Sequence, residues 1–352
     1  MPKKKKTEVV EEKMVCELAG DGSKAVTVAI KQLKKQFGDD VIDWLGSRQQ
    51  EPHSVIPTGS FGLDAALGVG GFVKGRIYEL YGPHSSGKTT LALSAIREAQ
   101  KMGGYAAYVD AEHTLDPDLL RKMEIDLDKI VIVQGYTGED NLDLAKTLIG
   151  TSQFDLCVID SVSALQPAAE ANLGSFSDNT MGLHPRLMSR MSRDLTPRVS
   201  RSKTALLLIN QIRANMGGYG NPETTSGGNA LQHHVSGKIR VSGGAVKSRQ
   251  LKNKQGDVIG HRVTFEVTKN KLAPPFRSAD VDLIYGSGFN KVGELIDLGV
   301  DMGFVDKAGS WYSYGDTKLG QGREASIALL AENDEIREKL AAEVKMLLGF
   351  GE

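Results

Sequence analysis

The chain has 352 residues, of which 40% are hydrophobic and 25% charged, and its formal net charge is −1. This length predicts a large core with one or two appendages, and the composition is that of an ordinary globular protein without a membrane-spanning apolar run. Because the chain is nearly neutral, any nucleic-acid binding must come from local basic patches. Two distant cysteines, Cys16 and Cys157, indicate a reducing compartment and no zinc site. We therefore expect a cytoplasmic protein with no membrane partner.

The N-terminal region predicts one helix. Residues 1–22 form a polar tail whose lysine-rich start is followed by acidic residues, not by the apolar stretch of a secretory signal. Residues 23–38 read SKAVTVAIKQLKKQFG, with Val26, Ile30, Leu33 and Phe37 at helical spacing. A polar linker ends near residue 50. The sequence leaves open whether this helix folds back on its own domain or docks on another copy.

A phosphate-binding loop is the strongest motif. It reads GPHSSGKTT at 82–90, between the strand pattern RIYELY and the helix pattern LALSAIREAQKM. In a P-loop, backbone N–H groups surround nucleotide phosphates, the lysine neutralises their charge and the threonine hydroxyl binds Mg²⁺. The alternative, a Gly/Ser turn that happens to precede a helix, does not explain the order of strand, loop and helix. The expected contacts are Gly82, Pro83, Ser85, Ser86, Gly87, Lys88, Thr89 and Thr90.

Four further apolar runs predict buried strands, separated by helical stretches. They are YAAYVD at 105–110, KIVIVQ at 129–134, DLCVID at 155–160 and TALLLIN at 204–210. Such alternation indicates an α/β fold with a mostly parallel sheet covered by helices, whose functional groups collect at the carboxyl ends of the strands. Lys88, Asp110, Glu112, Asp160 and Gln211 all follow or end a predicted strand, so we expect them along one edge.

Two glycine-rich segments, about 171–182 and 212–228, predict loops suited to a nucleic-acid backbone. Both begin just after residues of the predicted nucleotide site, so the hydrolysis state could order or release them. Arg186, Arg190 and Arg193 are spaced to share one face of a helix. A solvated charged face is the alternative interpretation of that stripe.

The remaining sequence predicts more strands and a small domain. KIRVSGG at 238–244, HRVTFEVTKNK at 261–271 and ADVDLIYG at 279–286 have the alternation of β-strands and extend the core to about residue 288. From residue 289 to 352 the pattern predicts a compact C-terminal α/β domain, with helices around a small hairpin.

Three residues match the needs of phosphoanhydride hydrolysis, which depends mainly on positioning and electrostatics. Asp160 follows four apolar residues and is the expected Mg²⁺ carboxylate together with Thr89; a turn-capping aspartate is the alternative. Glu112 is placed to act as general base, unless it is a surface acid in a loop. Gln211 is placed to bind the γ-phosphate. ATP and Mg²⁺ are the expected cofactors.

The motifs GPHSSGKTTL, YVDAEHTLDP, VIDSVSAL, INQIR, GNPETTSGGNAL, VTKNKLAPPF and GQG together resemble the bacterial RecA recombinases over nearly the whole chain. The resemblance implies a RecA-like P-loop ATPase core at 51–288, an N-terminal oligomerisation helix and linker at 23–50 and a C-terminal domain at 289–352. It also implies a DNA-dependent ATPase that forms a helical filament on single-stranded DNA, pairs it with homologous double-stranded DNA and promotes strand exchange.

The same resemblance implies roles for individual residues. Lys88, Glu112 and Gln211 become the catalytic group, and Asp116 a nucleotide contact. Lys269 and Lys271 are expected to reach the ATP of the adjacent subunit, and Tyr285 to lie near the adenine of a neighbouring ATP. The expected DNA contacts are Arg186, Arg193, Arg213, Gly227, Gly228 and Asn229.

Some positions depart from the family pattern. His84 stands where an acidic residue is usual, Leu119 where an aromatic residue stacks on adenine, and Gln232-His233 where a basic-aromatic pair links subunits. These departures put base stacking and cooperativity in doubt, and with the lysine-rich start they suit a divergent or phage-encoded member. A ring helicase and a non-catalytic single-strand-binding filament remain as rival functions. The VTKNK motif and both loops argue against the first, and the intact Glu112 against the second.

Overall fold

The computed structural model describes residues 22–38, 42, 44, 53–173, 180, 182–214, 223–244, 247–253 and 255–349. The chain divides into two units, residues 1–52 and 53–352. In the first unit, helix α2 (Gly22–Phe37) confirms the predicted helix. Val26, Leu33 and Phe37 of its apolar stripe are exposed, and the helix contains four lysines and no acidic residue.

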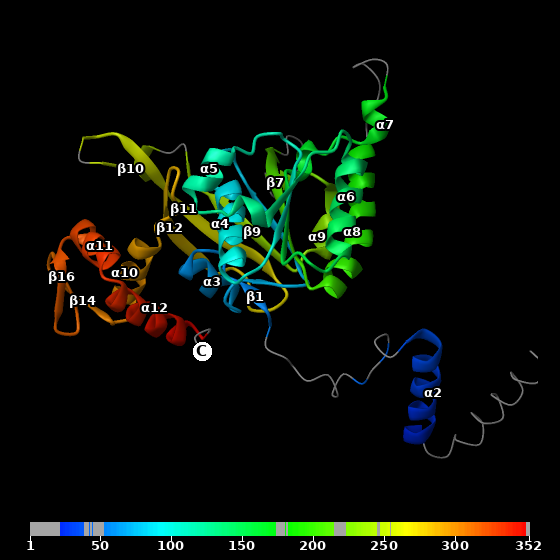
Figure 1. Ribbon diagram of the computed structural model, residues 1–352, viewed down its shortest axis with the longest axis horizontal. Coiled ribbons are helices and arrows are strands. Elements are labelled where there is room, and N and C mark those ends of the chain that lie inside the picture. The colour runs from blue at the N-terminus through cyan, green and yellow to red at the C-terminus, as the bar shows by residue number, and fades with distance from the viewer. Residues whose placement is uncertain are drawn as a thin grey trace, which may run out of the picture. The chain divides into compact units, whose positions relative to one another are not determined.

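An 11-stranded mixed sheet forms the centre of the second unit (Figure 1). Six of its strands run parallel in the order β9-β3-β7-β6-β4-β5. Their bounds are Gly237–Ser242 for β9, Ile77–Gly82 for β3, Ala205–Ala214 for β7, Leu156–Asp160 for β6, Ala106–Asp110 for β4 and Ile130–Val133 for β5. These strands confirm the predicted parallel core.

Antiparallel strands continue the sheet beyond β9. They are β11 (Val258–Asn270), β12 (Ser278–Ile284) and β13 (Gly288–Phe289), and β10 (Gln250–Lys252) pairs with β11. In β11, Val263, Phe265 and Val267 are buried while alternate residues are more exposed, as expected for a strand covered on one face. The predicted extension of the core sheet is therefore confirmed.

Helices cover both faces of the parallel strands. Alternate strand residues point to opposite faces, and each set packs in a separate apolar cluster with the helices on its side. On one face, Tyr108 and Val158 pack with α3 (Phe61–Leu67), α4 (Lys88–Lys101) and α5 (Pro117–Lys122). On the other, Val109 and Ile159 pack with α6 (Gly138–Gly150), α8 (Leu183–Ser202) and α9 (Gly228–His234). Short elements complete this region: β1 (Val55–Ile56), β2 (Phe72–Val73), η2 (Leu127–Lys129), η3 (Val162–Ala164), α7 (Ala168–Ala171) and η4 (Lys247–Arg249).

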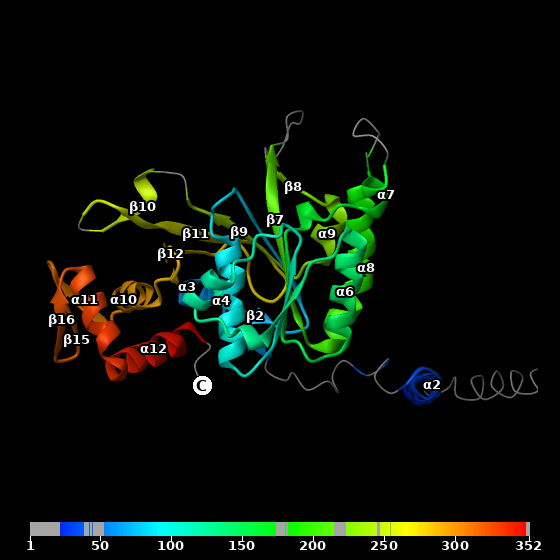
Figure 2. The same cartoon turned by 45° about the horizontal axis from the view of Figure 1, so that its top comes forward.

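The segment predicted as a loop at 212–228 has regular structure at both ends. Strand β7 continues to Ala214 and pairs antiparallel with β8 (Glu223–Thr225), with Ile212 opposite Thr225. β-Branched residues at these positions favour strand pairing. Figure 2 shows β7 and β8 as a ribbon that projects beyond the sheet. Most of the first predicted loop, residues 174–179 and 181, and the middle of the second lie outside the described residues.

The C-terminal region packs three helices against a small sheet. The helices are α10 (Lys291–Asp301), α11 (Arg323–Glu332) and α12 (Asp334–Leu348), and the strands are β14 (Val305–Ala308), β15 (Trp311–Tyr314) and β16 (Thr317–Gln321). Strands β14 and β15 form the predicted small hairpin, and a third strand, β16, pairs with β15 and buries Leu319 in the cluster. Among the described residues, no helix combines the length and the apolar character needed to span a membrane.

Candidate nucleotide site and nucleic-acid surface

The P-loop begins at the carboxyl end of β3 and leads into α4. Gly82 leaves no room for a side chain, because a Cβ there would lie 2.0 Å from the carbonyl oxygen of Val241. Gly87 has a φ of +100° and precedes the first turn of α4, a conformation that favours glycine. The helix therefore starts with its N-terminal N–H groups directed at the loop, where they favour an anion.

A cavity of about 240 Å³ lies over this loop. Its lining consists of Ser85, Ser86, Gly87, Lys88, Thr89, Thr90, His261, Leu283 and Tyr285. The buried Ser86 hydroxyl has no hydrogen-bond partner among the described residues. Such an unsatisfied group at a phosphate-binding loop suits a ligand that supplies oxygen acceptors. Thus the cavity collects the predicted nucleotide contacts from residue 85 to residue 90.

Tyr285 directly follows β12, which belongs to the same sheet as β3. Its side chain therefore lines the cavity over the P-loop of its own chain. Its predicted place near the adenine of a neighbouring ATP stays a prediction. Its ring is 5.7 Å from that of His261, and its side chain is 55% exposed. An exposed aromatic face beside the P-loop is suited to stacking on a nucleotide base.

Lys88 lies against the P-loop backbone. Its Nζ donates to the carbonyl oxygens of Gly82, at 3.0 Å, and Pro83, at 2.6 Å. Burial lowers the pKa of Lys88, and the nearby Asp160 and Glu112 oppose that shift. A buried ammonium group with loop carbonyls as partners is well placed to exchange them for phosphate oxygens.

The expected magnesium pair is in contact. Thr89 Oγ1 donates to Asp160 Oδ2 at 2.9 Å, and the Tyr108 hydroxyl donates to the same oxygen at 2.6 Å. Strands β4 and β6 are in register at Asp110 and Asp160, so Tyr108 reaches across from the neighbouring strand. Burial raises the pKa of Asp160, while both hydrogen bonds lower it. A hydroxyl and a buried carboxylate are oxygen donors that fit Mg²⁺.

Glu112 and Gln211 are also brought together. Glu112 Oε1 accepts a hydrogen bond from Ser161 Oγ at 2.6 Å and another from Gln211 Nε2 at 3.2 Å. Gln211 is within β7 rather than after it, because this strand runs on past the sheet edge. The predicted base thus contacts both the segment after the magnesium carboxylate and the strand that enters the second predicted DNA loop.

Of three other positions singled out in the sequence, Asp116 and Leu119 have structural roles. Asp116 caps α5, its carboxylate accepting from the Asp118 N–H at 2.9 Å. Leu119 is partly buried and packs against the core cluster, so it supplies an apolar side chain where the family pattern has an aromatic one. His84 is exposed in the P-loop.

Lys269 and Lys271 are held at the end of α9. Lys269 Nζ donates to the carbonyl oxygen of Gln232, and Lys271 Nζ donates to that of His233 at 3.0 Å. Burial lowers the pKa of Lys269, and the charges of Lys271 and Lys238 lower it further. In the part of the chain that the structure describes, neither lysine lines the cavity of its own P-loop.

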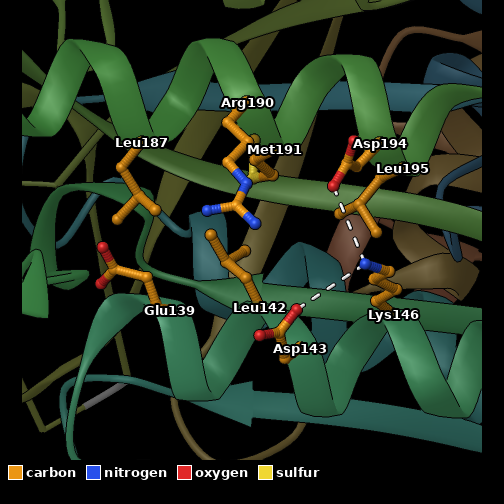
Figure 3. A pocket seen from close by; sticks show the side chains of 9 residues that line it. All are labelled: Glu139, Leu142, Asp143, Lys146, Leu187, Arg190, Met191, Asp194 and Leu195. Carbon is orange, nitrogen blue, oxygen red and sulfur yellow. Dashed lines mark ion pairs between the residues drawn. The ribbon is translucent and has the colours of Figure 1, made fainter.

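The predicted arginine stripe is divided by the structure. Arg186 and Arg193 are exposed on α8, and Arg193 Nε donates to the Ser189 carbonyl oxygen at 3.3 Å. Arg190 is exposed as well, and it points from α8 toward α6, into a groove that Lys146 also lines (Figure 3). That lysine lies 3.8 Å from both Asp143 and Asp194. The groove is separate from the P-loop cavity.

The other predicted DNA contacts lie between β7 and α9. Arg213 belongs to β7, but its side chain is outside the described residues. Gly227 precedes α9 with a φ of +98°, and Gly228 and Asn229 begin that helix instead of forming a separate turn. The side chain of Asn229 is likewise not described.

Sequence reasoning missed Tyr108, Ser161 and His261. Tyr108 was visible as the residue two positions before Asp110, on the same face of a strand that ends at the site. Ser161 directly follows Asp160. His261 had no local signal, since it comes from β11 and meets the P-loop only through the antiparallel part of the sheet.

A parallel sheet with a P-loop at the end of a central strand, and a carboxylate at the end of a nearby strand, defines a P-loop nucleotide-binding protein. The family model described as RecA N-terminal domain matches residues 24–290, and that described as RecA C-terminal domain matches residues 293–349. The chain belongs to the RecA family.

Relatives in several bacteria match the chain over most of its length. Protein RecA of Porphyromonas gingivalis is 48% identical over 322 residues, covering 91% of this chain and 93% of the relative. Protein RecA of Nitratiruptor sp. is 49% identical over 330 residues, covering 93% and 94%. Protein RecA of Desulforapulum autotrophicum is 46% identical over 328 residues, covering 93% of each chain.

Proposed function

We propose that this protein is an ATP-dependent DNA recombinase. It forms a helical filament on single-stranded DNA, pairs that strand with homologous duplex and promotes strand exchange, with DNA-stimulated ATP hydrolysis driving turnover. Membership of the RecA family supports this function. The observation that carries it within the fold is the contact of Glu112 with Gln211, which joins the predicted base to the strand leading into a predicted DNA loop.

Each residue of the site has a role in this mechanism. The P-loop N–H groups and Lys88 bind the phosphates of ATP, and Thr89 and Asp160 hold Mg²⁺. The metal, when bound, neutralises charge that develops on the phosphate oxygens. Glu112 accepts a proton from the attacking water. Gln211 senses the γ-phosphate, because its amide donates to Glu112 and is free to exchange that partner for a phosphate oxygen.

The proposed filament needs surfaces for a second copy. Val131 and Ile132 on the edge strand β5 are 42% and 45% exposed, and Leu144 on α6 is 48% exposed. An apolar strip of this kind on one copy is suited to the exposed apolar stripe of α2 on another. Lys269 and Lys271 would reach the phosphates of the adjacent subunit, which places ATP between subunits.

The two rival functions differ in what they require of these residues. A ring helicase shares the P-loop, Glu112 and Asp160, but the family match extends over the C-terminal domain as well as the core. A non-catalytic filament needs no water-activating carboxylate, whereas Glu112 is held by two hydrogen bonds near the magnesium pair.

Strand exchange between circular single-stranded DNA and homologous linear duplex, with ATP and Mg²⁺, tests the proposal. Joint molecules that form only with homologous duplex are expected. DNA-stimulated ATP hydrolysis without joint molecules would favour a motor, and DNA binding without any hydrolysis would favour the passive filament.

A further inference from the structure

A cavity of about 520 Å³ lies where the core meets the C-terminal region, apart from the P-loop cavity. It is enclosed by α4, the turn between β12 and β13, the start of α10, and α12. Figures 1 and 2 show α10 and α12 next to each other at one side of the core. Four basic residues from three helices line it: Arg97, Lys101, Lys291 and Arg337. None of the residues that line this cavity belongs to the nucleotide site or to the predicted DNA contacts.

Arg97 is the most informative of these residues because its side chain is largely buried while its terminal nitrogens are open to the cavity. Its side chain is only 8% exposed, yet within the described residues its single polar contact joins Nε to Glu98 Oε1 at 3.3 Å. A guanidinium group has five N–H donors, so four donors lack a protein partner. These terminal nitrogens are not among the sealed, unpartnered polar atoms of the described residues, so they are open to the cavity that this side chain lines. An anion in the cavity would supply the missing acceptors.

Positive charge gathers around Arg97. Glu98 is shared by three cations, since Lys291 Nζ lies 2.7 Å and Lys101 Nζ 3.7 Å from the oxygen that also contacts Arg97. Burial alone would raise the pKa of Glu98, but these cations hold it below its usual value. Among the described residues, Glu98 is the one carboxylate in contact with these three cations, and two further carboxylates, Glu124 and Glu338, line the cavity.

Other features of the cavity agree with a small anion. The first turn of α10 lines it, and the N-terminus of a helix favours negative charge. The two acidic lining residues, Glu124 and Glu338, are exposed, so they lie at the rim rather than beside Arg97. Phe61 and Leu295 supply an apolar wall to the cavity.

We propose that this cavity binds a small phosphate-bearing anion, with Arg97 as its buried anchor and Lys101 and Lys291 as further contacts. Arginine binds phosphate oxygens through paired N–H donors. The burial of Arg97 favours a small ligand over a DNA backbone, because a duplex at the surface reaches only exposed cations such as Lys101, which is 55% exposed. The site is independent of the proposed recombinase function.

Pyrophosphate is a suitable probe, and the Lys88→Ala variant removes most of its binding at the P-loop. Equilibrium dialysis with labelled pyrophosphate is expected to give one bound molecule per protomer in Lys88→Ala. Adding Arg97→Gln should weaken that binding about 10- to 100-fold, the effect of removing a charge-assisted hydrogen-bonding group. Lys318→Ala, an exposed lysine on β16, is the matched control and should leave binding unchanged.

Two further measurements keep the test decisive. If Arg97→Gln does not fold, Lys101→Glu serves instead, because that side chain is largely exposed and its reversed charge should still weaken binding severalfold. Absence of saturable binding in Lys88→Ala, or equal binding with and without Arg97, would overturn the proposal in favour of a purely structural ion cluster. Displacement of pyrophosphate from Lys88→Ala by duplex DNA would instead identify DNA as the ligand and overturn the assignment to a small anion.

Discussion

Glu294 offers a stringent test of how the C-terminal region is attached to the core. This carboxylate on α10 accepts hydrogen bonds from Ser60 Oγ at 2.6 Å and from the N–H groups of Phe61 and Gly62 at 3.0 and 2.8 Å. Burial is the largest influence and raises the pKa of Glu294 to about 7, although the three hydrogen bonds oppose it. Its closest charged neighbours are Asp64 on α3, which is also buried, and Lys291.

The sign of the pH effect follows from this shift. The pKa of Glu294 is about 7 in the folded protein and 4.5 as its ordinary value, so between these values the folded state binds more protons than the unfolded state. Stability from this group is therefore highest in acid and falls as the pH rises from about 4.5 to about 7. One pKa unit corresponds to about 1.4 kcal/mol, which gives roughly 2 to 3 kcal/mol between pH 5 and pH 8.

Urea unfolding of the wild type and Glu294→Gln at pH 5 and pH 8 measures this contribution. Because the variant lacks one acceptor oxygen at every pH, its stability differs from that of the wild type throughout. Only the change of this stability difference with pH reports the titration of Glu294. We expect the stability of the variant relative to wild type to improve by roughly 2 to 3 kcal/mol from pH 5 to pH 8. Glu332→Gln, an exposed glutamate on α11, is the control. A difference that does not change with pH would show that Glu294 is not buried as described.

Four further substitutions test the site. Glu112→Gln should reduce DNA-stimulated ATP hydrolysis about 10²- to 10⁴-fold, and undiminished turnover would refute its role as base. Tyr108→Phe removes a hydrogen bond to the proposed magnesium carboxylate, so the Mg²⁺ concentration for half-maximal hydrolysis should rise about tenfold; an unchanged requirement would contradict this. Gly82→Ala should abolish nucleotide binding because its Cβ would lie 2.0 Å from a backbone carbonyl, whereas Gly150→Ala has open space and should bind normally. Arg213→Ala should weaken single-strand binding for all sequences and reduce the salt slope by about 1, which a salt titration checks.

The parallel core and the nucleotide site were predictable because their signals are local. Near-continuous apolar runs mark β4, β6 and β7, and the residues after them necessarily meet at one sheet edge. That geometry predicts that Glu112 and Gln211 lie near each other. It does not predict the hydrogen bond between them. By contrast, β16 reads TKLGQ, in which Thr317 is the one β-branched residue, so its strand signal is weak.

The sequence did not predict which charged residues are buried. Arg97 and Glu98 look like neighbouring surface charges on α4, and only the approach of α10 and α12 encloses them. The same is true of Glu294, whose partners are more than 230 positions earlier in the chain. Long-range packing decides the environment of such groups, and no local pattern records it.

The position of β3 within the sheet has a consequence for how the molecule opens. β3 is hydrogen-bonded on both sides, to β7 and to β9, so amide protons from Ile77 to Gly82 should be among the slowest to exchange with solvent. Beyond Gln211, in contrast, the described part of β7 pairs with just the three residues of β8 among the residues that the structure describes. A two-stranded ribbon is only marginally stable by itself, so its protons should exchange through local opening while the base of the P-loop stays protected. The phosphate-binding end of the site is thus anchored, and the end that leads toward the predicted DNA loop is the part able to move.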